Sequence, residues 1–132
     1  MNEDIRWKQR FENFGKALAT LQEMIADHEK NLSSRAYEIA VVAAFQFTFE
    51  LGWKTLKDYM NYGGTARDTI KNAFNSELIT DGQIWIDMLD DRNILAHSYD
   101  QKKALAAVNN IKTRYINAIE QVHSLLQEKW GQ

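Results

Sequence analysis

The feature that most restricts the fold is the absence of proline from all 132 residues, together with a count of only six glycines. Proline breaks the hydrogen-bond ladder of a helix interior, so nothing of that kind interrupts long helices here. Near both ends, apolar residues recur at alternating spacings of three and four, which places them on one helix face. These series predict a helix over 5–30 and another that follows Asp100; their members are Trp7, Phe11, Phe14, Leu18, Leu21 and Ile25, and Ala104, Val108, Ile111, Tyr115, Ala118, Val122 and Leu125.

A long helix is predicted over 35–62, where Ser33 or Ser34 can supply the N-cap. Its residues 39–51 are apolar nearly all round, which is typical of a central helix covered on several sides. Gly63-Gly64 is expected to end this helix by providing a left-handed residue at its C-terminus.

Two capping signatures predict where two shorter helices begin. In each, a threonine is followed three residues later by a polar partner: Thr65 by Asp68, and Thr80 by Gln83. The first starts a short helix that ends near residue 75, and the second starts a helix that carries Arg92 in its later turns. The pattern predicts an all-α fold, an antiparallel up-down four-helix bundle with a short additional helix.

Composition narrows the class of protein further. A chain of this length forms a single domain, residues 1–132, and the absence of cysteine excludes disulfides and cysteine zinc sites. The net charge of −2 leaves no global basic field, so any nucleic-acid contact must be local. The N-terminus lacks the pattern of a signal peptide, and the longest apolar run, 39–45, is too short to span a bilayer. We expect a cytoplasmic protein with no membrane contact.

The chemistry of the chain is concentrated between Asp91 and Asp100, where Arg92, His97 and Tyr99 occur within eight residues. Arginine suits phosphate, histidine titrates nearest neutral pH, and tyrosine offers a hydroxyl that can be modified. On a regular helix, however, residues five apart point about 140° away from each other. Arg92 and His97 can therefore act together only if the helix loosens near His97, or if two copies of the motif meet across a dimer axis. Asp100 is the expected N-cap of the last helix, which favours a break near Ser98. Alone, such residues often make only structural hydrogen bonds.

The wider pattern resembles the HEPN domains and, within them, the nucleotidyltransferase substrate-binding proteins. Their signature is Arg-x4-His-x-Tyr with asparagine after the arginine, and Arg92, Asn93, His97 and Tyr99 match each position. The resemblance covers most of the chain from the second predicted helix onward. One departure is Thr65-Ala66-Arg67, where relatives commonly carry proline before the arginine. The other matching segments are Phe49 to Lys54, the Gly63-Gly64 turn, and Leu78-Ile79 with Trp85.

The resemblance implies a homodimer whose motifs lie near the dimer cleft, and two roles. One role is that of partner to a minimal nucleotidyltransferase that can transfer AMP to the motif tyrosine, here Tyr99, in a toxin–antitoxin-like pair. The other is a metal-independent ribonuclease, the toxic member of such a pair. We rank the partnership first, and expect no cofactor and no metal. The chain lacks the motifs of a nucleotidyltransferase, so that activity belongs to the partner.

The residues fit both roles chemically. His97 can serve as general base or acid on a ribose 2′-hydroxyl, while Arg92 stabilises charge on the phosphate and Asn93 orients the imidazole or substrate. Glu50 can pair with one of these cations, or simply with Lys54 one turn along its own helix. Tyr99 either accepts AMP, which would place charge and bulk beside Arg92, or packs its ring at a helix junction.

Several other residues have a plainer expectation. We expect His28 and His123 to be structural or solvent-facing, because neither has a partner at metal-ligand spacing. The aromatic residues that could stack on bases are more often core or dimer interface, and we favour core; they are Trp53, Trp85, Phe45, Phe47 and Phe49. A modest basic rim for RNA phosphate or nucleotide can form from Lys102, Lys103, Arg67 and Lys71.

Overall fold

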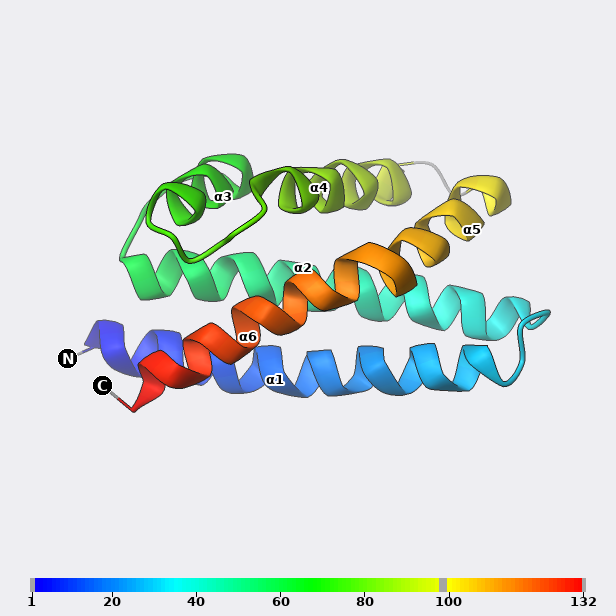
Figure 1. Cartoon of the computed structure of the whole chain (residues 1–132), viewed down its shortest axis with the longest axis horizontal. Coiled ribbons are helices and arrows are strands. Elements are labelled where there is room, and N and C mark those ends of the chain that lie inside the picture. Colours follow the sequence, from blue (N-terminus) through cyan, green and yellow to red (C-terminus); the bar gives the residue numbers. More distant parts are fainter. Residues whose placement is uncertain (1, 98–99, 132) are drawn as a thin grey trace.

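The computed structural model describes residues 2–97 and 100–131. Within these residues every regular element is a helix, which confirms the all-α class (Figure 1). In chain order the elements are α1 (Asn2–Glu29), α2 (Arg35–Met60), α3 (Ala66–Asn75), α4 (Gly82–His97), α5 (Gln101–Asn110), the π-helical turn η1 (Ile111–Tyr115) and α6 (Ile116–Trp130).

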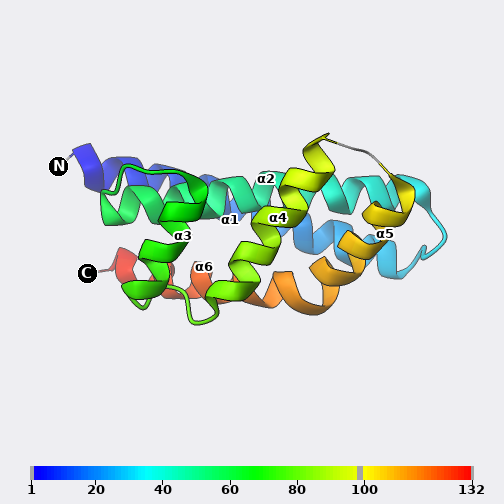
Figure 2. The ribbon, with the colours of Figure 1, turned by 90° about the horizontal axis from the view of Figure 1, so that it is seen from above.

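Helix α2 is central, as its all-round apolar composition predicted. It lies antiparallel beside α1, while α5, η1 and α6 form a continuous rod that crosses the pair diagonally (Figure 1). Helices α3 and α4 lie obliquely across α2, which is clearest from above (Figure 2). Helix α2 is therefore contacted by α1, by α3 and by the α5–α6 rod.

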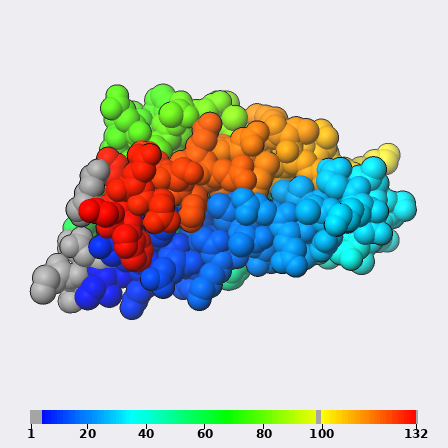
Figure 3. All heavy atoms as spheres, turned by 60° about the horizontal axis from the view of Figure 1, so that its bottom comes forward, coloured from blue at the N-terminus to red at the C-terminus, as the bar shows by residue number. Residues whose placement is uncertain are grey.

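The core is rich in aromatic side chains. Phe14, Phe45, Phe49, Trp85 and Tyr115 are all essentially inaccessible to solvent. The ring of Phe45 stacks on those of Phe49 and Tyr115, with centroids 6.0 and 5.5 Å away. On one face of the molecule α6 packs against the first half of α1 (Figure 3). The expectation that these aromatic residues belong to the core is confirmed except at Phe47, which is 63% exposed.

Three of the predicted N-caps are confirmed. The hydroxyl oxygens of Ser34 and Thr65 accept hydrogen bonds from the backbone N–H groups of Tyr37 and Asp68. The carboxylate of Asp100 accepts one from Lys102 N–H and starts α5. Because a cap satisfies backbone donors that the helix itself cannot, it fixes where each helix begins.

Two predicted boundaries are wrong in their capping residue. The left-handed residue that ends α2 is Asn61, with φ of 51°, and no glycine has positive φ in the described chain. Asparagine tolerates this conformation, and the N–H groups of Asn61 and Tyr62 bond back to Asp58 and Lys57 carbonyls. At the start of α4, the acceptor is Asp81, whose carboxylate bonds Ile84 N–H, instead of Thr80.

The seams of the first and last predicted helices are buried nearly as expected. On α1 only Ile25 is partly exposed. On α6 the fully buried residue of the last turns is Leu126, while Leu125 is half-buried. Positions three and four residues after Val122 lie close to the same face, and packing selects the second. No described helix is long and apolar enough to cross a membrane.

Candidate functional site

The carboxylate of Glu50 joins α2 to the motif helix α4. Arg92 Nη1 donates a hydrogen bond to Glu50 Oε2 over 2.8 Å, and Trp53 Nε1 donates to the same oxygen over 3.1 Å. Lys54 Nζ lies 3.3 Å from the other oxygen, Oε1. Both pairings considered for Glu50 are thus present together, and the carboxylate fixes Arg92 against the central helix.

Arg92 is held on a second side by an aromatic ring. Its guanidinium carbon lies 5.8 Å from the centroid of Phe49, within the range of a cation–π contact. Its Nε atom is buried, and within the described structure it makes no hydrogen bond. The side chain keeps 26% of its surface exposed, so the guanidinium is anchored on Glu50 while part of it faces solvent.

Helix α4 (Gly82–His97) is helical through His97. The break that the sequence predicts near Ser98 falls outside the described residues, and the chain is helical from Arg92 to His97. Asn93 and His97, one turn apart on α4, are both exposed. Within one chain Arg92 and His97 therefore point in different directions, by about 140° on a regular helix. Tyr99 lies outside the described residues, as does Ser98.

Asp91, which sequence reasoning did not single out, links the motif to the rod formed by α5, η1 and α6. Tyr115 donates its hydroxyl hydrogen to Asp91 Oδ2 over 2.6 Å, and Asn110 Nδ2 lies 3.5 Å from the same oxygen. Burial, and then the Asp91 carboxylate, raise the pKa of Tyr115. A signal did exist, because a buried tyrosine needs a partner for its hydroxyl.

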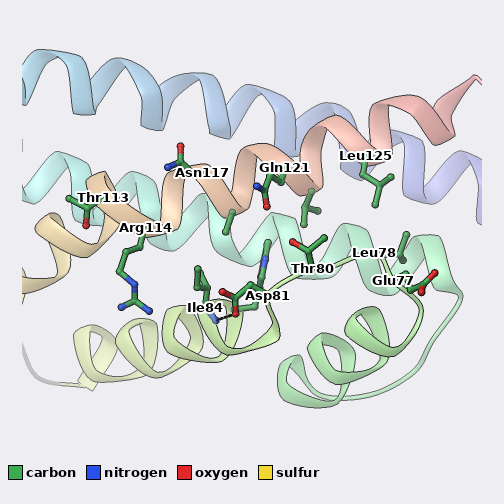
Figure 4. A pocket seen from close by; sticks show the side chains of 13 residues that line it. Glu77, Leu78, Thr80, Asp81, Ile84, Thr113, Arg114, Asn117, Gln121 and Leu125 are labelled. Atoms are coloured by element: carbon green, nitrogen blue, oxygen red, sulfur yellow. Dashed lines mark hydrogen bonds between the residues drawn. The ribbon is translucent and has the colours of Figure 1, made fainter.

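Away from the motif, a groove of about 630 Å³ lies between the first turns of α4 and helix α6 (Figure 4). At its edge, Arg114 Nη2 lies 2.7 Å from Asp87 Oδ2. The hydrogen bond from Gln83 and that from Arg114 lower the pKa of Asp87. The groove is thus bordered by an ion pair, and Arg92 is not among its lining residues.

Of the four positive charges in the predicted basic rim, one is paired with a carboxylate. Arg67 Nη2 lies 3.2 Å from Asp90 Oδ1, so the charge of Arg67 is offset by α4. Lys71, Lys102 and Lys103 are exposed. Among the described residues, no group of three or more histidine, aspartate or glutamate side chains is placed to hold a metal ion.

Comparison with known proteins gives the class that this fold and motif define. The family described as "Nucleotidyltransferase substrate binding protein like" matches residues 9–128. A curated relative, the probable ribonuclease HepT of Haemophilus influenzae, is 35% identical over 81 residues. That match spans 53% of this chain and 54% of the relative, about half the length of each.

Three solved structures share the fold. A Haemophilus influenzae protein described as the substrate-binding domain of a nucleotidyltransferase aligns with a TM-score of 0.76 at 22% identity, over 89% of this chain and 98% of its own. A tri-AMPylated Shewanella oneidensis HEPN toxin, in complex with its MNT antitoxin, gives 0.73 at 16% identity, over 92% and 96%. A structure described as a mutant of the toxin–antitoxin MntA–HpeT gives 0.72 at 16% identity, over 97% and 99%.

The class is therefore that of all-α proteins with the fold of a nucleotidyltransferase substrate-binding domain. Within it, the chain belongs to the nucleotidyltransferase substrate-binding protein family, whose match includes Glu50, Arg92, Asn93 and His97. The resemblance drawn from the motif is confirmed at this level.

Proposed function

We propose that this protein is the substrate-binding partner of a minimal nucleotidyltransferase, and that the two form a toxin–antitoxin pair. The observation that carries the proposal is the family match over residues 9–128, because it covers both the scaffold and the Arg92–His97 motif. Two structural neighbours, a HEPN toxin with its MNT antitoxin and the MntA pair, support this assignment.

Tyr99 is the proposed acceptor of AMP from that partner. It follows His97 by two residues and precedes the Asp100 cap of α5. An adenylyl group there would add negative charge and bulk next to the motif, where it would compete with an RNA phosphate for Arg92. The Shewanella neighbour is itself described as AMPylated.

Incubation with the cognate nucleotidyltransferase and ATP, followed by intact-mass and peptide mass spectrometry, tests this role. We expect one or more adenylyl groups on the wild type and on a Tyr37→Phe control, and loss of labelling at residue 99 in Tyr99→Phe. Equal labelling of Tyr99→Phe and wild type would show that another residue accepts AMP.

A second function, metal-independent RNA cleavage, is favoured by the way Arg92 is held. A cation fixed by Glu50 and Phe49 is preorganised to stabilise charge on a phosphate. His97, exposed at the end of α4, is accessible as general base or acid for a 2′-hydroxyl or a leaving oxygen. Asn93 lies one turn away from His97 and can orient the imidazole or the substrate.

For this chemistry two copies of the chain must complete one site, since α4 stays regular between Arg92 and His97. The surface that would bring them together ends one turn before Glu50. Ile39, Ala43 and Phe47 form an exposed apolar stripe on α2, and Ile94 is exposed on α4 beside the motif. We propose that these apolar residues form the homodimer interface, because exposed apolar side chains that gather on one helix face favour association.

Sedimentation of a Phe47→Glu variant tests this interface. Leu32→Glu is the matched control, because Leu32 and Phe47 are both 63% exposed. We expect wild type and Leu32→Glu to sediment as dimers and Phe47→Glu as a monomer. If Phe47→Glu remains dimeric, a different surface forms the dimer. Mixing Arg92→Ala with His97→Ala subunits then tests the shared site, because only mixed dimers would regain RNA cleavage.

A further inference from the structure

A pocket of about 440 Å³ lies at the junction of the first turns of α1 with the end of α2. Its lining carries three cationic side chains, Arg6, Arg10 and Lys57, and one carboxylate, Asp58. The remaining lining residues are uncharged. We refer to this cavity as the basic pocket.

The charges in the basic pocket are not equally available to a ligand. Arg10 Nε lies 3.0 Å from Asp58 Oδ2, and the Asp58 side chain is only 11% exposed. This pair is therefore part of the pocket wall. Arg6 and Lys57 remain as the cations in excess, so the pocket carries two net positive charges in a protein whose overall charge is negative. Such a local field favours an anion.

The basic pocket is connected to the candidate site along one face of α2. Glu50, Lys54, Lys57 and Asn61 follow one another at spacings of four, three and four, which keeps them on one helix stripe. The ammonium groups of Lys54 and Lys57 lie 5.9 and 5.8 Å from the ring centroid of Trp53, whose Nε1 donates to Glu50. Cationic side chains thus continue from Arg92, through Lys54 and Lys57, to the pocket.

The spacing along this stripe suits a polymer of phosphates. From Glu50 to Lys57 the rise of the helix is about 10 Å, at ~1.5 Å per residue. Along the axis of a stacked nucleic-acid strand the rise is about 3.4 Å per nucleotide, and adjacent phosphates lie farther apart than this rise, so at most roughly three phosphates would fit between the candidate site and the pocket. A single small anion would need only one end of this track.

We propose that the basic pocket binds a backbone phosphate of an RNA strand that extends from the Arg92 site along the Lys54 and Lys57 stripe. The inference deepens the proposed function, since it takes RNA as the molecule recognised at the motif. Contacts of this kind position a strand without reading its sequence. The pocket therefore adds affinity and fixes the direction of the strand relative to His97.

RNA binding by an Arg6→Gln/Lys57→Gln double variant tests the inference. Arg10 is kept, because its removal would leave the buried Asp58 carboxylate unpaired. The double variant and its parent both carry His97→Ala, so that cleavage cannot distort the binding measurement. The control is a Lys16→Gln/Lys30→Gln variant, which removes two exposed positive charges outside the pocket. The measurement is fluorescence anisotropy of a labelled, mixed-sequence single-stranded RNA over a range of salt concentrations.

Each phosphate contact on a single strand contributes about 0.7 to the slope of log affinity against log salt. Loss of the one pocket phosphate should lower the slope by about 0.7 and the affinity by ~5-fold at 0.1 M salt. The control should match its parent. An unchanged slope in the double variant, or no RNA binding by the parent, would overturn the inference. If the double variant loses binding to the nucleotidyltransferase but keeps RNA binding, the pocket is a protein interface instead. AMP transfer to Tyr99 tests the proposed function separately from this measurement.

Discussion

At the scale of single residues, Glu50 and Asp91 determine how the motif is held. Glu50 accepts hydrogen bonds from Arg92 and Trp53 and pairs with Lys54, while Asp91 accepts from Tyr115. The two carboxylates thus tie α4 to the central helix and to the α5–α6 rod. Arg92 is anchored by Glu50, and Asp91, the residue directly before it, is anchored by Tyr115. Both anchors therefore lie at the start of the motif.

Glu50→Gln should destabilise the fold modestly and disturb Arg92. The substitution keeps the shape of the side chain but removes its charge, and the carboxylate is 32% exposed, so solvent screens part of the loss. We expect the free energy of unfolding to fall by about 1 kcal/mol in urea denaturation. Exposed Glu23 supplies the control, and an equal stability of Glu23→Gln and Glu50→Gln would contradict the anchoring role.

His123 should make stability depend on pH. Its ring stacks on Phe11 with centroids 4.6 Å apart, and burial lowers its pKa below the ordinary 6.5. The unfolded chain therefore binds the proton more readily, so stability is intact above about pH 6.5 and falls as the pH drops toward the lowered value in the folded state. We expect His123→Phe to flatten this slope in denaturation series between about pH 7 and pH 5. A slope identical to that of wild type would show that other groups cause it.

At the scale of elements, periodicity was sufficient for the helices and insufficient for the irregular turn. Three-four spacing predicted both long seams, and capping chemistry placed Ser34, Thr65 and Asp100 correctly. The π-helical turn over Ile111–Tyr115 was not foreseen, because the same apolar spacing continues through it. Asn61 was missed since Gly63-Gly64 gave the stronger turn signal, although the left-handed residue comes two positions earlier.

This π-helical turn predicts a specific role for Tyr115, whose side chain is 1% exposed. Such turns often occur at functional sites, and here the turn presents Tyr115 to Asp91 beside the motif. Tyr115→Phe leaves Asp91 without its short hydrogen bond and should lower the free energy of unfolding by about 1–2 kcal/mol. Thermal denaturation of Tyr115→Phe against Tyr37→Phe checks this, and equal melting temperatures would contradict it.

At the scale of the whole molecule, one stripe of α2 combines two surfaces. Its first half is apolar and exposed at Ile39 and Phe47, and its second half carries Glu50, Lys54 and Lys57. The sequence could place these residues on one face but could not show which neighbour meets them. The Glu50–Arg92 pair joins residues 42 positions apart, and only the packing of α4 across α2 brings them together. For the same reason the exposure of Phe47 could not be inferred from an aromatic-rich helix.

At the same scale, we propose that a minimal nucleotidyltransferase binds this chain. Native mass spectrometry of the two proteins after co-expression measures this most directly, because it weighs the complex and any adenylyl groups together. We predict a complex that contains both chains, with the mass of this chain raised by AMP when ATP is present. Detection of the two proteins only as separate species, with the unmodified mass of this chain, would contradict the account.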